Sequence, residues 1–236
     1  MRFYSLIFEN NKILALLRKK IEKNRILSKI IFNLFELFLK FRFKLYESKS
    51  ELSQIYKVYF FNPLKVKYQS FNQRIIDSNG AVIGGDWDLK ENLKKFKQSE
   101  KYISFYEHFI LKKRWEETKY YKSVEKAIKR GNEKYRCVTL NDLKERFDYF
   151  DYLYNRIKNY GYKTQENLVR ENGKVTDTGG YKRIRRKDHE IKVAIGREGE
   201  IIFLDGRHRL MIAQLLNLKK VPFIIGAIHQ DFLEKN

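Results

Sequence analysis

The feature that most constrains the fold is a series of short apolar segments near the C-terminus. Ile191–Ile195 and Ile201–Leu204 are rich in β-branched residues and flank a turn around Gly199, which predicts two strands. Arg207–Leu218 then carries apolar residues at helical spacing, and Val221–Ile228 is typical of a further strand. This order predicts a small mixed β-sheet with packed helices, and therefore the α+β class.

The polar residues of this region gather where the second strand meets the helix, in Asp205-Gly206-Arg207-His208-Arg209. Gly206 lets the backbone turn sharply and approach a ligand. The N–H groups and the dipole of the first helical turn favour an anion there, and the next three side chains add charged donors. Asp205 is placed to bind a metal ion or to orient a hydroxyl. A surface turn closed by salt bridges is the alternative, but packing alone does not require three donor side chains in succession, so we interpret the turn as a phosphate site.

These residues resemble a known family. The stretch IIFLDGRHRLMIAQLLNLKKVPFII (201–225) is similar to the core of the ParB/sulfiredoxin-like superfamily, in which a strand, a Gly-x-x-Arg turn, a helix and a Val-Pro strand recur. VYFFNPLKV (58–66) resembles its first strand. In ParB proteins the turn binds CTP phosphates, and free-serine kinases carry the similar Asp-Gly-His-His-Arg. Sulfiredoxin has a catalytic Cys where this chain has Arg207, so peroxiredoxin repair is not expected. The resemblance covers about Ile191–Ile228 and, more weakly, Ile55–Tyr68, and implies a ParB/sulfiredoxin-like nucleotide-binding domain, which we place at residues 51–236.

The rest of this domain is predicted as short strands and a helical insertion at about residues 89–160. Proline, glycine and asparagine separate the β-rich segments from one another. The predicted strands are Ile55–Phe61, Leu64–Tyr68 and Ala81–Ile83, and the predicted helices are Leu89–Leu111, Ser123–Arg130 and Asn141–Asn159, the last ended by Gly161.

A second acidic cluster, Gly84-Gly85-Asp86-Trp87-Asp88, follows one of the predicted strands. Asp86 or Asp88 could act as a general base toward a hydroxyl or hold Mg²⁺, with Trp87 against the substrate. Alternatively, Asp88 caps a helix that begins at Leu89 and Trp87 belongs to the core. For phosphoryl transfer we expect the two carboxylates to face the Asp205–Arg209 turn across one cleft. If they lie far from it, the function reduces to nucleotide binding.

Three more residues are candidate contacts to a base or substrate. Trp115 and Glu116 lie between two predicted helices, where an aromatic ring can stack on a base but more often packs in a core. His229 follows the last predicted strand and can line the same site, although a lone histidine is usually structural.

Residues 1–50 differ from the rest and are predicted as a basic amphipathic helical extension. They hold 12 Lys and Arg against 4 Asp and Glu. Apolar residues recur every three or four positions at Leu27, Ile31, Leu34, Phe38, Phe41 and Leu45. Intervening charges make the segment unsuitable as a membrane span. Residues 12–46 therefore either lie on an anionic membrane surface or pack on the core or on a partner.

The overall charge favours polyanionic partners. The 236 residues include 50 Lys and Arg against 29 Asp and Glu, a net charge of +21. Nucleotides, nucleic acid and anionic lipid fit such a surface, although a lysine-rich composition also follows from an AT-rich genome. The single cysteine and four scattered histidines provide neither a disulfide nor a Cys- or His-based metal site, which indicates a cytoplasmic protein, with peripheral attachment to the inner face of the membrane as a further option.

Two functions follow. The first is a phosphotransferase that uses ATP, ADP or CTP with Mg²⁺ and acts on a hydroxyl, with a glycan or lipid-linked sugar as candidate acceptors. In it, Asp86, Asp88 and Asp205 are the candidate catalytic residues. The second is a ParB-like nucleotide-binding switch or a nucleic-acid-binding or nuclease module, which the positive charge favours.

Overall fold

The computed structural model describes residues 57–172 and 189–235. The chain divides into two units, Met1–Glu51 and Leu52–Asn236, and every described residue belongs to the second. The helix predicted within residues 1–50, with its membrane-binding segment 12–46, lies outside the described residues. Within the described ranges no helix is both long and apolar enough to cross a bilayer. The described part combines helices with a mixed sheet, which confirms the α+β class.

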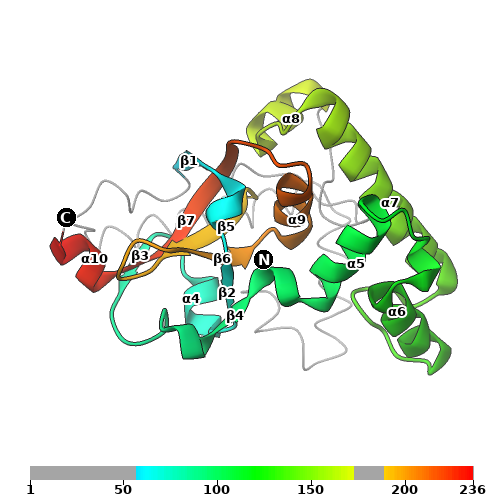
Figure 1. Ribbon diagram of the computed structural model, residues 1–236, viewed down its shortest axis with the longest axis horizontal. Helices are drawn as coiled ribbons and strands as arrows, with labels where there is room; N and C mark the ends of the chain where they lie inside the picture. Colours follow the sequence, from blue (N-terminus) through cyan, green and yellow to red (C-terminus); the bar gives the residue numbers. More distant parts are fainter. Residues whose placement is uncertain (1–56, 173–188, 236) are drawn as a thin grey trace, which may run out of the picture. The chain divides into compact units, whose positions relative to one another are not determined.

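A seven-stranded mixed sheet has the order β1-β7-β5-β6-β2-β4, and β3 also pairs with β7 (Figure 1). Strands β3, β5 and β7 are mutually parallel, whereas β6 is antiparallel to β5. The carboxyl end of β6 therefore lies at the opposite end of the sheet from theirs. The strands are β1 (Val58–Phe61), β2 (Tyr68–Ser70), β3 (Ala81–Ile83), β4 (Leu93–Lys95), β5 (Ile191–Ile195), β6 (Ile201–Asp205) and β7 (Val221–His229).

The C-terminal unit has the predicted order of elements. Strand β5 has the predicted bounds, while β6 and β7 each extend one residue further, to Asp205 and His229. Between them, α9 (Arg207–Leu215) is shorter than predicted, because Asn217 adopts a left-handed conformation with φ of 51°. Local sequence patterns were sufficient here because each element is short and has a distinct turn residue at its end.

Hydroxyl caps define the starts of the long helices. The side chains of Ser99, Thr118 and Thr139 accept backbone N–H bonds at the starts of α5, α6 and α7. Gly161, with φ of 75°, ends α7 as predicted. The helices other than α9 are α4 (Gln73–Asp77), α5 (Glu100–Phe109), α6 (Lys119–Lys129), α7 (Leu140–Tyr160), α8 (Gln165–Asn172) and α10 (Gln230–Lys235).

Two predicted elements are wrong. The first half of the predicted helix Leu89–Leu111 is instead β4 between two 3-10 turns, η3 (Lys90–Asn92) and η4 (Phe96–Gln98), because pairing of β4 with β2 buries Leu93. The predicted strand Leu64–Tyr68 begins as a 3-10 turn, η2 (Pro63–Lys65). The side chain of Asn62 accepts the N–H of Leu64 and starts that turn.

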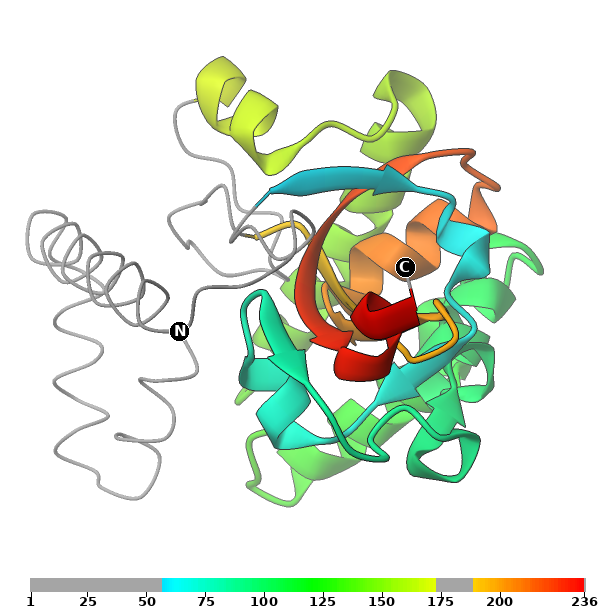
Figure 2. The ribbon, with the colours of Figure 1, turned by 90° about the vertical axis from the view of Figure 1, so that its left-hand side faces the viewer.

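Helices cover both faces of the sheet unequally. Side chains of α5, α6, α7 and α9 form a large aromatic core with one face of the sheet. A smaller core on the other face includes Ile75 and Ile76 of α4 together with Trp87. Figures 1 and 2 show α4 and α9 on opposite sides of the sheet. The large core matters for function because it brings α5, α7 and the start of α9 together.

Candidate functional site

The Asp205–Arg209 turn joins β6 to α9 through a glycine that no other residue could easily replace. Gly206 has φ of 87°, and a Cβ there would lie 3.0 Å from the Cα of Ile191. The exposed Asp205 accepts the N–H of Gly206 at 2.9 Å, and the carbonyl of Gly206 accepts the N–H of Leu210. No side chain caps α9, so the first helical turn keeps N–H donors that the helix itself does not use.

Arg207, the first residue of α9, lies against aromatic rings. Its guanidinium carbon is 5.1 Å from the ring centre of Phe203 and 5.5 Å from that of Phe96. In the part of the chain that the structure describes, no carboxylate forms an ion pair with it and no acceptor takes a hydrogen bond from it. Burial lowers the pKa of Arg207, while Tyr135 and Asp205 act in the opposite direction. A half-buried guanidinium without an acceptor favours an anionic ligand.

His208 lies between two helices of the large core. Its ring stacks on Phe105 of α5, with ring centres 5.7 Å apart, and packs at a tilt against Phe150 of α7, with ring centres 4.5 Å apart. Its Nε2 is buried and has no hydrogen-bond partner among the described residues. Burial, together with the positive charges of Arg146, Lys101, Arg207 and Arg209, lowers the pKa of His208 well below its usual value. The imidazole is therefore neutral at physiological pH.

Arg209 differs from Arg207 because its guanidinium contacts His189 and Glu190 of the protein. Its guanidinium donates to the carbonyl of His189 and lies 3.7 Å from the carboxylate of Glu190. Both Arg209 and Glu190 are buried. Glu190 also accepts the N–H of Gln165 at 2.5 Å, which connects the start of β5 to α8. The structure thus gives Arg209 a position that stabilises the turn, whereas Arg207 makes no hydrogen bond or ion pair with the described residues.

Lys101, at the start of α5, adds a further positive group to this side of α9. Its Nζ lies 3.6 Å from the ring centre of Tyr135 and 5.2 Å from that of Tyr120. No hydrogen bond or ion pair joins its amine to any of the described residues. Burial, and then the charges of Arg207, Arg146 and Lys134, lower the pKa of Lys101 to about 7.

Arg146 of α7 and the turn before it complete the cluster. Arg146 is buried and donates twice to the Tyr120 hydroxyl, at 3.1 and 3.2 Å, and once to the carbonyl of Tyr135 at 3.0 Å. Tyr135 and Arg136 both adopt left-handed conformations, with φ of 52° and 66°. Such values are unfavourable for residues with a side chain, so this turn holds the Tyr135 ring over Lys101 at a conformational cost.

We call Lys101, Lys134, Arg146 and Arg207, together with the neutral imidazole of His208 beside them, the cationic cluster. Two acidic residues act on the cluster: Glu100 raises the pKa of Lys101, and Asp205 raises that of Arg207. Both carboxylates are exposed. Neither forms an ion pair with a cluster residue among those described. Gathering positive groups in partly buried surroundings is unfavourable unless an anion compensates them. The cluster, together with the start of α9, is therefore the candidate anion site.

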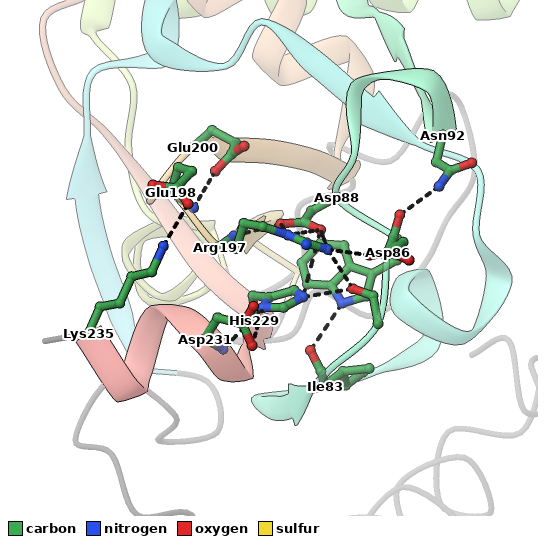
Figure 3. A network of polar contacts seen from close by, with 12 residues as sticks. Ile83, Asp86, Asp88, Asn92, Arg197, Glu198, Glu200, His229, Asp231 and Lys235 are labelled. Atoms are coloured by element: carbon green, nitrogen blue, oxygen red, sulfur yellow. Dashed lines mark hydrogen bonds and ion pairs between the residues drawn. The ribbon is translucent and has the colours of Figure 1, made fainter.

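The second acidic cluster has a different role, shown in Figure 3. Arg197, in the turn between β5 and β6, donates to both carboxylate oxygens of Asp88 at 2.8–3.1 Å and to Asp86 at 2.9 Å. Its backbone N–H also binds Asp88, at 2.6 Å. Burial raises the pKa of Asp88, but the side-chain and backbone hydrogen bonds from Arg197 outweigh this effect and leave the pKa lowered. We call this network the Asp88–Arg197 clasp.

His229 is part of this clasp and not of the anion site. Its Nε2 lies 2.7 Å from the carbonyl of Gly85, and its Nδ1 accepts the N–H of Asp231 at 3.1 Å. Since a carbonyl can only accept, Nε2 carries the proton and the neutral ring is fully satisfied. Figure 3 shows the ring below Arg197. His229 is buried, as expected of a structural histidine.

The clasp and the Asp205–Arg209 turn lie at opposite ends of the sheet. The clasp joins the ends of β3, β5 and β7 to the beginning of β6, whereas the turn follows the end of β6. From Ile201 to Asp205 the strand advances about 13 Å, at roughly 3.3 Å per residue. The expectation that Asp86 and Asp88 face the turn across one cleft is therefore wrong. It failed because β6 runs opposite to β3, a direction that the sequence pattern does not reveal.

Both tryptophans belong to the core, which was the alternative interpretation for each. Trp87 is buried and donates to the carbonyl of Ile83 at 3.1 Å. Trp115 is buried against His108, with ring centres 3.9 Å apart, and donates to Asp151. Glu116 is exposed in the 3-10 turn η5 (Trp115–Glu117). Asp88 caps no helix, since the following turn has Leu89 at its N-cap and no side-chain bond there.

The Asp86 and Asp88 pair does not suit Mg²⁺. Arg197 already binds both oxygens of Asp88 and one of Asp86. Among the described residues there is no group of three or more histidine, cysteine or acidic side chains placed to hold a metal. An ion at this position would have to displace the guanidinium from a nearly ideal arrangement.

Most residues of the cationic cluster were not predicted from the sequence. Lys101, Lys134 and Arg146 are far apart in sequence and meet only in the folded domain. One signal was present for Arg146: it falls between Leu143 and Phe150, at helical spacing on the apolar face of α7. A charged residue at a core position requires a partner, and such positions are often functional.

Comparison with known proteins gave no match: no family model, curated protein or solved structure is significantly similar to this chain.

Proposed function

We propose that this chain binds the phosphates of a nucleotide at the start of α9, within a ParB/sulfiredoxin-like domain. The observation that carries the proposal is the convergence of Arg207, His208 and Lys101. Each has a nitrogen without a hydrogen-bond partner among the described residues, and neither Arg207 nor Lys101 forms an ion pair there. Gly206 brings the backbone N–H groups of the helix start to the same place.

A phosphate group fits these donors better than a carboxylate does. Its oxygens accept several hydrogen bonds from different directions, and it carries up to two negative charges. The planar guanidinium of Arg207 and the helix start are both suited to such a group. The resemblance of the Asp205–Arg209 motif to nucleotide-binding turns points to the same ligand.

Phosphoryl transfer is a second candidate function, and Asp205 favours it. This carboxylate is exposed and directly precedes the phosphate turn, so it is the acid best placed to act on an acceptor hydroxyl. Asp86 and Asp88 take no part, because they are held at the other end of the sheet. The proposal places any Mg²⁺ on the phosphates of the ligand, where it would neutralise charge.

Nucleotide-dependent thermal stabilisation tests the proposal. We expect ATP, ADP or CTP, measured with and without Mg²⁺, to raise the melting temperature of the wild-type protein, because a ligand that binds only the folded state stabilises it. Arg207→Gln should lose most of this shift. Arg74→Gln, which removes an exposed arginine on the other face of the sheet, is the matched control and should keep it.

Two outcomes would contradict nucleotide binding: no shift with any of the three nucleotides, or an undiminished shift in Arg207→Gln. A shift produced by DNA or RNA but not by nucleotides would instead favour the nucleic-acid-binding alternative. For phosphoryl transfer, Asp205→Asn should keep the shift and lose nucleotide turnover, which separates chemistry from binding.

A further inference from the structure

Lys101 has an unusual position for a lysine near a protein surface. It is the second residue of α5, two positions after the Ser99 cap, and is only partly exposed. Its amine lies over the face of Tyr135 at 3.6 Å, close to van der Waals contact. Contact with an aromatic face stabilises a charged amine but provides no hydrogen-bond acceptor. Among the described residues, no carboxylate or other protein acceptor binds this amine.

The charged groups around Lys101 come from each of the neighbouring segments. Arg207 of α9, Arg146 of α7 and Lys134 of the preceding turn oppose its positive charge. Glu100 of its own helix favours that charge, but is exposed and makes a smaller contribution. The phenol rings of Tyr120 and Tyr135 complete its surroundings. Burial raises the pKa of Tyr120 to about 12 and also raises the pKa of Tyr135, so both phenols stay neutral.

Binding of an anion would reverse the net electrostatic effect of these surroundings on the charged amine of Lys101. Without a ligand, desolvation and three positive neighbours favour the neutral amine, and the pKa of Lys101 falls to about 7. A phosphate among Arg207, Arg146 and Lys101 replaces net repulsion with attraction and supplies acceptors for the ammonium group. The protonated form then becomes strongly favoured.

We propose that Lys101 is a ligand-binding residue of the anion site and takes up a proton when a phosphate-bearing ligand binds. The inference rests on the proposed function, because it requires the ligand to occupy the cationic cluster. It extends that function to the helical segment between β4 and β5, which supplies Lys101, Lys134 and Arg146. Affinity for the ligand should fall by up to about tenfold per pH unit above pH 7, since each binding event must recruit the proton.

Calorimetric titration in buffers with different ionisation enthalpies tests the inference. ATP is titrated into the full-length protein at about pH 8 with excess Mg²⁺, where phosphate groups are already ionised. The dependence of the observed heat on buffer ionisation enthalpy counts the protons exchanged. For wild type we expect a net uptake of most of one proton, because a group with a pKa of about 7 is largely neutral at that pH.

Two variants make the test specific. Lys101→Met keeps much of the side-chain volume, should reduce the uptake to near zero and should weaken binding. Lys97→Met is the matched control, since Lys97 is an exposed lysine one turn earlier that also lies over a tyrosine, Tyr102, at 5.9 Å. It should leave both the uptake and the affinity unchanged.

Failure of the inference can be distinguished from failure of the proposed function. If ATP binds in an Arg207-dependent manner but releases the same heat in every buffer, Lys101 does not gain a proton and the inference is overturned. An uptake that persists in Lys101→Met overturns it as well. If ATP produces neither heat nor a thermal shift, the nucleotide-binding proposal fails, and the inference fails with it.

Discussion

At the scale of single residues, Gly206 determines whether the anion site can form. Its φ of 87° lies in the region that residues with a side chain rarely adopt. It also packs against β5, where a Cβ would meet backbone and side-chain atoms of Ile191 at 3.0 and 3.3 Å. Backbone atoms in a central strand cannot move aside, so a substitution here is unfavourable for both conformational and steric reasons.

Gly206→Ala should therefore destabilise the protein more than Gly131→Ala. Both glycines have positive φ, but a Cβ at Gly131 would meet nothing within 4 Å. We expect about 1–2 kcal/mol from conformation alone at Gly131 and a larger loss at Gly206. Denaturant unfolding of the two variants measures the difference. Equal losses would show that the turn can open away from Ile191 without cost.

The sequence predicted the candidate anion site as one motif but did not distinguish the roles of the residues within it. The motif Asp205–Arg209 identified the strand end, the glycine and the helix start, since these are local features. It did not separate Arg207 from Arg209, because their roles depend on which groups the fold places beside them. Glu190, which engages Arg209, lies 19 positions earlier, next to a predicted strand and with no motif of its own.

At the scale of elements, the Asp88–Arg197 clasp fixes the β5–β6 turn to the segment after β3. Asp88 has almost no exposed side-chain surface, so its bonds to Arg197 are protected from water. The clasp involves side chains from separate elements and lies at the end of the sheet opposite the anion site. It should therefore affect stability and leave ligand binding unaltered.

Asp88→Asn should lower the melting temperature by several degrees at neutral pH and leave the ATP-induced shift unchanged. Because the folded-state pKa of Asp88 is lowered, its carboxylate contributes stability above its unfolded-state value, near 4, and loses it as pH falls through the folded-state value. The difference from wild type should therefore narrow in acid. Loss of the ATP shift in a folded Asp88→Asn protein would mean that the clasp communicates with the anion site.

The elements with clear local sequence signals were predicted, whereas β4 and the relative directions of the strands, which depend on long-range pairing, were not. The C-terminal strands and α7 have clear periodicity and glycine or hydroxyl residues at their ends. Residues 89–98 also have a helix-like composition, yet pairing of β4 with β2 places Leu93 in the smaller core and overrides that tendency. The direction of β6 relative to β3 likewise depends on long-range pairing, which is why the acidic cluster was assigned to the wrong end of the sheet.

At the scale of the whole molecule, the cationic cluster should make stability depend on pH. Lys101 has a folded-state pKa of about 7, below its unfolded value near 10.4. Between these values the unfolded chain binds a proton that the folded protein does not, so the free energy of unfolding rises with pH. His208, whose folded-state pKa is lowered, adds a loss of stability as pH falls below about 6.5.

The melting temperature should accordingly rise between about pH 6 and pH 9. Tyrosine side chains, with an ordinary pKa of about 10, are not yet ionised in this range. Lys101→Met should flatten the part above pH 7, while Lys97→Met should not. The comparison of these two variants separates the effect of Lys101 from the general relief of a net charge of +21 as pH rises. A wild-type profile that is flat or falls between pH 7 and 9 would contradict the assignment of Lys101.

The most direct test of the anion site is a crystal structure of the protein with ATP and Mg²⁺. The account predicts a phosphate within hydrogen-bond distance of the Arg207 guanidinium and the N–H groups of the first turn of α9, with Lys101 on the same ligand. Asp86 and Asp88 should remain bound to Arg197, away from the nucleotide. A nucleotide bound elsewhere, or phosphates bound at the clasp in place of the α9 turn, would contradict the central claim.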